Sequence, residues 1–357
     1  MEMVTRQKTR VVHIGGVPIG GGHPIVIQSM TNTDTRNVAA TVAQIHALQE
    51  AGCEIARVAV PDMEAAAALK EIKRQITIPL VADIHFDYRL ALESVAGGVD
   101  KLRINPGNIG DGLRLQKVAE AAKTAEIPIR VGVNGGSLEK EIMTKYGMSP
   151  EALAESALRN VSMLEKYGFN NIVVSVKASN VQLMLDAHKI LAKRLSYPLH
   201  IGLTEAGTPY RGTIHSAVGI GALLAMGIGD TIRVSLAGDP VQEIRPAREI
   251  LTALGLRGFG VTVIACPSCG RTNIDVGGLA TEIEARLTHI NKPITVAVMG
   301  CVVNGPGEAR EADIGVAGGS GVGALFRKGE IVRKVFVDEI VDAIVDEVEN
   351  LTNTNDE

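Results

Sequence analysis

The feature that most constrains this chain is a regular alternation of short apolar segments with Ala-, Leu-, Glu- and Lys-rich stretches of helical periodicity. Strands that are apolar throughout are typical of parallel sheets covered by helices. The predicted strands are Ile25–Met30, Glu54–Val60, Pro79–His85, Lys101–Pro106, Pro128–Asn134, Asn171–Ala178, Leu199–Glu205 and Thr231–Ala237. Eight βα units in roughly 230 residues match a (β/α)8 TIM barrel, so we predict this α/β fold over an open doubly wound sheet.

The pattern changes after Gly255–Gly258. We predict a second, α+β domain, which divides the chain into a substrate-binding barrel (1–255) and a smaller unit (256–357). Its predicted strands are Val261–Ala265, Ile294–Met299, Asp313–Ala317 and Ile331–Phe336, and its helices are Gly277–Ile290 and Val337–Leu351. The glycine-rich segment Gly318–Gly323 lacks the Lys-Ser/Thr of a phosphate loop, which favours a hairpin turn. Gly20–Gly22 is predicted to turn at the bottom of the barrel.

Composition excludes several classes of protein. Of the 357 residues, 46% are hydrophobic and none is Trp, so the core must be mainly aliphatic. The net charge of −4 argues against a general nucleic-acid binder. Residues 258–357 carry 8 Lys/Arg and 15 Asp/Glu, which leaves the barrel region slightly cationic. No signal peptide is recognisable, the longest apolar run is too short to span a bilayer, and the four cysteines form no disulfide framework. We therefore expect a cytoplasmic protein without a membrane partner.

Charged and polar residues lie late in the predicted barrel strands, at every second position. Active sites of TIM barrels lie at this end of the strands. The candidate anion-binding residues are Arg57, Arg103, Arg130, Asn134, Lys177, Arg233 and Ser235. Five cations from five strands suit two phosphate groups. A single such arginine would more often form a structural ion pair, for which Asp62, Glu93 and Glu155 are candidate partners.

Glu205 is the last residue of the seventh predicted strand and lies among these cations. It is a candidate general acid or base, or only a counter-charge for them. His85 and His200 are interpreted as hydrogen-bonded histidines in or near the barrel, and Cys53 as a small buried hydrophobic residue.

Three cysteines near the C-terminal end form a separate pattern, Cys266-Pro-Ser-Cys269 and Cys301-Val-Val-Asn-Gly-Pro-Gly-Glu308. Thiolates select zinc or an iron–sulfur cluster. A saturated cubane cluster needs four protein ligands, so three thiolates leave one iron open or held by a weaker oxygen ligand. An open iron can bind a substrate oxygen. The alternative is structural zinc, although zinc modules usually take their ligands as two close pairs and His289 is the nearest histidine.

The sequence resembles the 4-hydroxy-3-methylbut-2-enyl diphosphate synthase family, iron–sulfur enzymes of the bacterial non-mevalonate isoprenoid pathway. The resemblance runs essentially end to end. It rests on Gln28-Ser-Met-Thr-Asn32, Ala56-Arg-Val-Ala-Val-Pro61, Ala82-Asp-Ile-His85, Leu102-Arg-Ile-Asn-Pro-Gly-Asn108, Arg130-Val-Gly-Val-Asn134, Leu203-Thr-Glu-Ala-Gly207, Cys266-Pro-Ser-Cys-Gly-Arg271 and Cys301-Val-Val-Asn-Gly-Pro-Gly-Glu308.

This resemblance implies a barrel followed by a unit like the cluster domains of sulfite and nitrite reductases. It implies a 4Fe–4S cluster held by Cys266, Cys269, Cys301 and Glu308. The implied reaction is two-electron reductive opening of 2-C-methyl-erythritol 2,4-cyclodiphosphate with loss of water, and reduced flavodoxin or ferredoxin supplies the electrons. It also implies a head-to-tail homodimer, in which the cluster domain of one subunit caps the barrel of the other. We expect Glu308 to leave the cluster when substrate arrives, and Glu205 to protonate the departing hydroxyl.

Two other functions remain open on the sequence. An aconitase-like dehydratase would use the open iron as a Lewis acid and would need no reductant. A binding module would hold a sugar phosphate in the barrel while zinc stabilises the small domain. Activity without reductant would indicate the first, and zinc without iron or sulfide the second.

Overall fold

The computed structural model describes residues 5–109, 112–301, 307 and 309–353. Its chain divides into two compact units, Met1–Arg257 and Gly258–Glu357. The predicted division, between residues 255 and 256, lies two residues before this one. Among the described helices, none combines the length and the apolar character that crossing a membrane requires.

The first unit is a barrel of eight parallel strands. In chain order they are β3 (Val26–Met30), β4 (Ile55–Ala59), β5 (Leu80–Asp83), β6 (Lys101–Ile104), β7 (Ile129–Asn134), β8 (Ile172–Lys177), β9 (His200–Ile201) and β10 (Thr231–Ile232). Hydrogen-bonded neighbours follow the order β8-β7-β6-β5-β4-β3-β10-β9, and a parallel bridge between Val174 and Leu199 joins β8 to β9. The two ends of the sheet therefore meet, which confirms the predicted TIM barrel and excludes an open doubly wound sheet.

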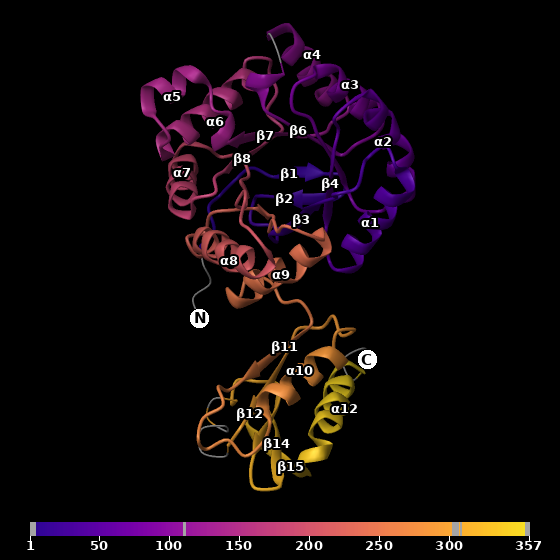
Figure 1. The fold of residues 1–357 in the computed structure, drawn as a ribbon, viewed down its shortest axis with the longest axis vertical. Helices are drawn as coiled ribbons and strands as arrows, with labels where there is room; N and C mark the ends of the chain where they lie inside the picture. Colours follow the sequence, from indigo (N-terminus) through magenta and orange to yellow (C-terminus); the bar gives the residue numbers. More distant parts are fainter. Residues whose placement is uncertain (1–4, 110–111, 302–306, 308, 354–357) are drawn as a thin grey trace. The chain divides into compact units, whose positions relative to one another are not determined.

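Helices surround this barrel on the outside (Figure 1). They are α1 (Val38–Glu50), α2 (Met63–Gln75), α3 (Tyr88–Ala96), α4 (Gly112–Thr124), α5 (Lys140–Tyr146), α6 (Pro150–Glu165), α7 (Val181–Arg194), α8 (Pro209–Ala225) and α9 (Ile244–Ala253). Several begin at an Asn, Asp or Ser side chain that accepts a backbone N–H of the first turn, as Asn37, Asp62 and Asn180 do. Each of these caps fixes the residue at which a helix begins and the preceding loop ends.

The last two barrel strands are shorter than predicted. β9 covers only His200–Ile201 and β10 only Thr231–Ile232. The segments that follow β9 and β10 approach each other so closely at Gly202 that a Cβ atom on this residue would lie 2.4 Å from the carbonyl oxygen of Arg233. Glu205 then takes a left-handed conformation, with φ of 56°. Glu205 therefore lies in the loop between β9 and α8, and its predicted place at the end of a strand is wrong.

The bottom of the barrel is closed by a hairpin that the sequence analysis missed. Strands β1 (Val12–Ile14) and β2 (Val17–Ile19) pair antiparallel. Their buried side chains pack against the first residues of the barrel strands, among them Val26, Ile55 and Val81, and Figure 1 shows the hairpin inside the ring of strands. Gly20–Gly22, all with positive φ, then form the predicted turn into the barrel. The open end is thus the C-terminal end of the strands.

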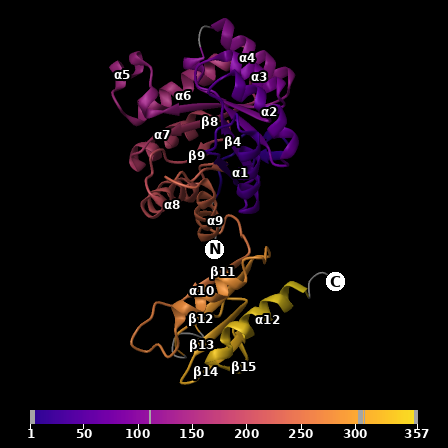
Figure 2. The ribbon, with the colours of Figure 1, turned by 45° about the vertical axis from the view of Figure 1, so that its right-hand side comes forward.

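The second unit is a five-stranded mixed sheet in the order β11-β12-β13-β14-β15 (Figure 2). The strands are β11 (Val261–Ala265), β12 (Ile294–Met299), β13 (Ile314–Gly318), β14 (Val322–Arg327) and β15 (Glu330–Phe336). The first three are parallel, and β13, β14 and β15 form antiparallel hairpins. Strand β14 was not predicted, although the glycine-rich turn before it was. Helices α10 (Val276–Arg286) and α12 (Ile340–Asn353) contribute to one apolar core with the sheet.

Candidate active site

A cavity of about 210 Å³ lies at the C-terminal ends of the barrel strands. Alternate residues of a barrel strand point inward, so the late polar positions of neighbouring strands meet there. Its lining includes all seven predicted substrate-binding residues together with Glu205. The lining residues are Arg57, Asp83, His85, Arg103, Arg130, Gly132, Asn134, Ser175, Lys177, Leu203, Thr204, Glu205, Arg233 and Ser235. The sequence pattern therefore predicted a set of residues that the fold brings together.

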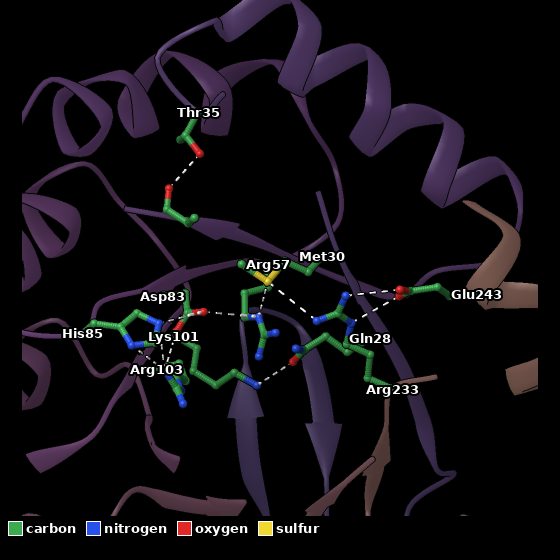
Figure 3. Close-up of polar contacts among 11 residues, drawn as sticks. Gln28, Met30, Thr35, Arg57, Asp83, His85, Lys101, Arg103, Arg233 and Glu243 are labelled. Carbon is green, nitrogen blue, oxygen red and sulfur yellow. Dashed lines mark hydrogen bonds and ion pairs between the residues drawn. The ribbon is translucent and has the colours of Figure 1, made fainter. Parts of the chain in front are cut away.

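One buried carboxylate lies among the cations of β4 and β6. An oxygen of Asp83 is 3.1 Å from Nη1 of Arg103, and the other is 3.8 Å from Nε of Arg57 (Figure 3). His85 also contacts both Asp83 and Arg103. Burial opposes ionisation of Asp83, but the charge of Arg57 and the hydrogen bond from His85 outweigh it and hold the pKa of Asp83 well below its usual range. Asp83 is therefore ionised and orients two arginines.

A second buried carboxylate, Glu243, was missed by the sequence analysis. Arg233 donates from Nε and Nη2 to the two oxygens of Glu243, at 3.1 and 3.2 Å (Figure 3). Glu243 also accepts hydrogen bonds from Ser29 Oγ at 2.8 Å and from the backbone N–H of Leu236 at 3.1 Å. It lies at the end of the 3-10 turn Pro240–Glu243, just after the eighth strand. Glu243 lies only ten residues after Arg233 in the sequence, and this short separation was the signal that could have identified the pair.

The partners proposed from the sequence alone are wrong. Asp62 caps α2 and lies 3.4 Å from surface Arg36. Glu155 pairs with Arg194 at 3.2 Å, also on the surface. Glu93 lies on α3 and does not line the cavity. The separation in sequence did not reveal which acids the barrel interior would hold.

We expect Glu243→Gln to weaken anion binding by about tenfold, because one bidentate charge-assisted pair to Arg233 is lost while the shape is kept. Calorimetric titration with inorganic pyrophosphate would measure this change. The Arg233→Met, Glu243→Gln double variant should bind no more weakly than Arg233→Met alone, because Glu243 acts through Arg233. Independent, additive losses would contradict this role.

These two carboxylates do not compensate all the cations of the cavity. Nε and Nη1 of Arg130 and Nε of Arg103 are buried and have no hydrogen-bond partner among the described residues. Burial lowers the pKa of Arg57 to about 9 against the opposing charge of Asp83, and burial together with the neighbouring guanidinium groups lowers the pKa of Arg130 and Lys177. Burying several positive groups together, with N–H donors that lack an acceptor, costs free energy unless an anion accepts their hydrogen bonds. The arrangement is therefore suited to a multiply charged anion.

Glu205 is exposed in the loop above these cations. It lines both the cavity and a wider adjoining hollow of about 580 Å³, which Asn105, Asn108 and Phe86 also line. A side chain at this junction can approach a ligand from the open side while the cations hold it from below. Glu205 is placed where a proton donor or acceptor could act, and it forms no part of the two buried pairs.

The three cysteines predicted to bind a metal belong to the second unit. Cys266 follows β11 directly and Cys301 follows Gly300 after β12, and these two strands are parallel neighbours, so both cysteines lie at the same edge of the sheet. Gly300 N donates to Cys266 Sγ at 3.1 Å. Cys269 lies in the turn that Thr272 closes, because Thr272 N donates to the Cys269 carbonyl at 3.0 Å. The fold thus brings the Cys266–Cys269 turn next to the segment that leads to Cys301.

The chemistry of these residues fits a cluster of iron and sulfide. All three thiols are free and at least partly exposed. The backbone N–H of Arg271 lowers the pKa of Cys269, which favours the thiolate that binds metals. In the part of the chain that the structure describes, no three such ligands already converge on one point. Glu308, the predicted fourth ligand, lies outside the described residues.

The other candidates have structural surroundings. Cys53 is buried in the barrel, and burial raises its pKa to about 12, as expected for a small hydrophobic residue. His200 is buried and bonds Thr231 Oγ1 through Nδ1 at 2.8 Å. His289 lies 3.8 Å from Glu349, on the exposed side of the second unit. None of these three lines the cavity at the barrel mouth.

The fold and the site define a TIM-barrel protein with a cation-lined cavity at the barrel mouth and an appended α+β unit that carries three free cysteines. Two family models match the chain, the GcpE TIM-barrel domain over residues 9–248 and the GcpE protein C-terminal domain over residues 262–350. The chain belongs to the GcpE family.

Similar proteins agree with this assignment. The chain is 60% identical over 347 residues to 4-hydroxy-3-methylbut-2-en-1-yl diphosphate synthase (flavodoxin) of Caldanaerobacter subterraneus, covering 97% of this chain and 98% of that protein. The enzyme of the same name from Geobacter sulfurreducens is 58% identical, over 97% and 98%. Among solved structures, dihydropteroate synthase of Stenotrophomonas maltophilia matches 69% of this chain and 98% of its own, with a TM-score of 0.51 and 13% identity. The last likeness concerns the barrel fold alone.

Proposed function

We propose that this chain is an iron–sulfur oxidoreductase that converts 2-C-methyl-D-erythritol 2,4-cyclodiphosphate into 4-hydroxy-3-methylbut-2-enyl diphosphate, by two-electron reductive ring opening with loss of water. The observation that carries this proposal is the set of buried, incompletely paired cations around one cavity. Two bridged phosphate groups would satisfy them. The names of relatives with 57–60% identity point to the same reaction product.

In this proposal the barrel holds both phosphates. Arg57, Arg103, Arg130, Lys177 and Arg233 supply charge, and Asn134 and Ser235 supply neutral hydrogen bonds. Asp83 and Glu243 fix three of the arginines before the substrate arrives. Such preorganisation lowers the cost of ordering long side chains on binding.

Cys266, Cys269 and Cys301 would hold a 4Fe–4S cluster, with Glu308 as an exchangeable fourth ligand. When bound, the cluster would supply the two electrons and a Lewis-acidic iron. The free thiols, and the hydrogen bond from Gly300, the residue before Cys301, to Cys266 Sγ, support this donor set. A carboxylate is a weaker ligand for iron than a thiolate, so Glu308 could yield its position to a substrate oxygen.

The redox partner and the assembly follow from the same proposal. Reduced flavodoxin, which the relatives' names include, is the expected donor, and ferredoxin is the alternative. The cavity and the cysteines lie in different units of one chain. A head-to-tail homodimer in the cytoplasm, in which the cysteine-bearing unit of one subunit closes the barrel of the other, would bring the two together.

An anaerobic assay of the reconstituted enzyme would test this function. With the cyclodiphosphate and reduced flavodoxin we expect 4-hydroxy-3-methylbut-2-enyl diphosphate, and no product without reductant. The EPR spectrum of the reduced enzyme should change when the cyclodiphosphate is added. Equal turnover without reductant would instead support an aconitase-like dehydratase, and zinc in place of iron would indicate a binding module.

We expect Glu205→Gln to bind the cyclodiphosphate with near-normal affinity and to turn it over about 100-fold more slowly. The substitution keeps the shape and removes the proton that Glu205 would give to the departing hydroxyl, and general acid catalysis contributes on the order of 100- to 10,000-fold. Single-turnover kinetics with pre-reduced enzyme would measure the step. If the variant turns over normally, Glu205 serves only as a counter-charge.

A further inference from the structure

A second polar layer lies beneath the cavity, inside the barrel. Its side chains are fully buried and come from β3, β6, β7 and β9. They are Gln28, Lys101, Arg130 and His200, of which Arg130 also lines the cavity. TIM barrels usually fill their interior with branched aliphatic residues. Here such packing is found where Val26, Ile55 and Val81 meet the hairpin β1–β2.

Lys101 crosses the interior of the barrel at this level. Its Nζ donates to Gln28 Oε1 at 3.2 Å (Figure 3), and β4 and β5 lie between the two strands in the sheet. Lys101 has 0% exposure. Among the residues that the structure describes, Gln28 Nε2, Arg130 Nε and Nη1, and His200 Nε2 are buried with no hydrogen-bond partner. Gln28 and Arg130 thus carry buried N–H donors for which the described part of the barrel supplies no acceptor.

The charges around Lys101 all oppose its protonation. From β7 it faces Arg130 and from β4 Arg57, whereas Gln28 on β3 is neutral. His200 on β9 also senses the charge of Lys101, and its own pKa is lowered by burial and by these cations. On β5, the carboxylate of Asp83 is paired with Arg57 and Arg103. Burial and the two guanidinium groups lower the pKa of Lys101 well below its ordinary value.

We propose that Lys101 is a further anion-recognition residue, which acts from beneath the cavity and takes up a proton from solvent when a doubly phosphorylated ligand binds. The inference rests on the proposed function. Bound phosphates would place negative charge above Arg57 and Arg130 and so offset the two charges that disfavour the ammonium. Anion binding and protonation of Lys101 are then one linked event, and affinity falls as pH rises.

Calorimetric titration of the oxidised holoenzyme, without reductant, tests this linkage. The cyclodiphosphate and inorganic pyrophosphate are each titrated at about pH 8 in two buffers of different ionisation enthalpy. The difference in binding heat between the two buffers gives the number of protons taken up. Lys177 also carries a lowered pKa, so the informative quantity is the difference between variants. On binding the anion, Lys101→Met should take up about one proton fewer than the wild type. One linked proton changes the affinity by up to about tenfold per pH unit, and the affinity of the variant should lack this part of the pH dependence.

Two further variants make the result specific. Lys70→Met removes an exposed lysine on α2 and should leave the proton number unchanged. Gln28→Glu places a carboxylate beside the ammonium, so Lys101 should be charged before binding and the uptake should fall although the lysine remains. This variant also decides the matter if Lys101→Met fails to fold.

The outcomes separate this inference from the proposed function. Normal binding of the cyclodiphosphate with the same proton number in wild type and Lys101→Met would overturn the role of Lys101 and leave the proposed function intact. If the cyclodiphosphate does not bind but pyrophosphate shows the expected difference, the proposed substrate is wrong and the role of Lys101 stands. Failure of both anions to bind the wild type would overturn both.

Discussion

Replacing Cys269 with serine is expected to remove most of the bound iron and to lower the rate of product formation by more than about 100-fold. A serine hydroxyl is a harder and much less acidic ligand than a thiol, so it does not replace a thiolate on iron. Changes to the outer shell of a metal site already cost about 10- to 100-fold, and loss of a direct ligand should cost more. Iron and sulfide analysis and the visible absorption spectrum would measure the loss.

Cys53 provides the matched control for this variant. Of the four cysteines in the sequence, it is the one outside the second unit, and it is buried in the barrel. Cys53→Ala should therefore keep its full content of iron. Glu308→Ala should fall between the two, with the cluster retained, an altered EPR spectrum and slow turnover. Normal iron in Cys269→Ser, or an unchanged spectrum and full activity in Glu308→Ala, would contradict the assigned ligands.

Arg130→Met should raise the dissociation constant for the cyclodiphosphate by about 100-fold. Charge-assisted hydrogen bonds are worth about 1.5–3 kcal/mol each, and two buried donor nitrogens of Arg130, Nε and Nη1, have no partner in the part of the protein that the structure describes. The melting temperature should not fall, because the variant also removes a buried charge that lies among other cations. Titration calorimetry and thermal unfolding would measure the two effects on the same sample.

Arg159 is a suitable control for loss of positive charge. It is an exposed residue of α6, where it pairs with Glu141 at 3.0 Å. Surface pairs contribute little, so Arg159→Met should bind the ligand as the wild type does. Near-normal affinity in Arg130→Met, or a marked loss of stability without a change in affinity, would show that Arg130 is structural.

Much of this protein could be predicted from the sequence, because its signals are local and periodic. Most barrel strands are short apolar segments with polar side chains at some inward positions, as at Arg130 and Asn134 on β7. Periodicity of two is enough to place these side chains on one face, and βα repetition is enough to bring their strand ends together. The notion of a separate strand–helix unit whose strands lead into Cys266 and Cys301 likewise followed from local apolar runs, and β11 and β12 lie there.

Tertiary structure alone decided the features that depend on distant segments meeting. The hairpin β1–β2 closes the barrel through contacts with several strands, and strand β9 ends at Ile201, so that Glu205 lies in the following loop with a positive φ. Which carboxylates neutralise the arginines was also undecided. Asp83 lies late in a predicted strand, but nothing in the sequence made it the partner of Arg57 and Arg103, and Glu243 is no more conspicuous than Asp62 or Glu155. Lys101 reads as an ordinary strand residue until the barrel closes and brings Gln28 to its Nζ across the interior. Burial, and hence the electrostatics of this site, is a property of the closed barrel and not of any one strand.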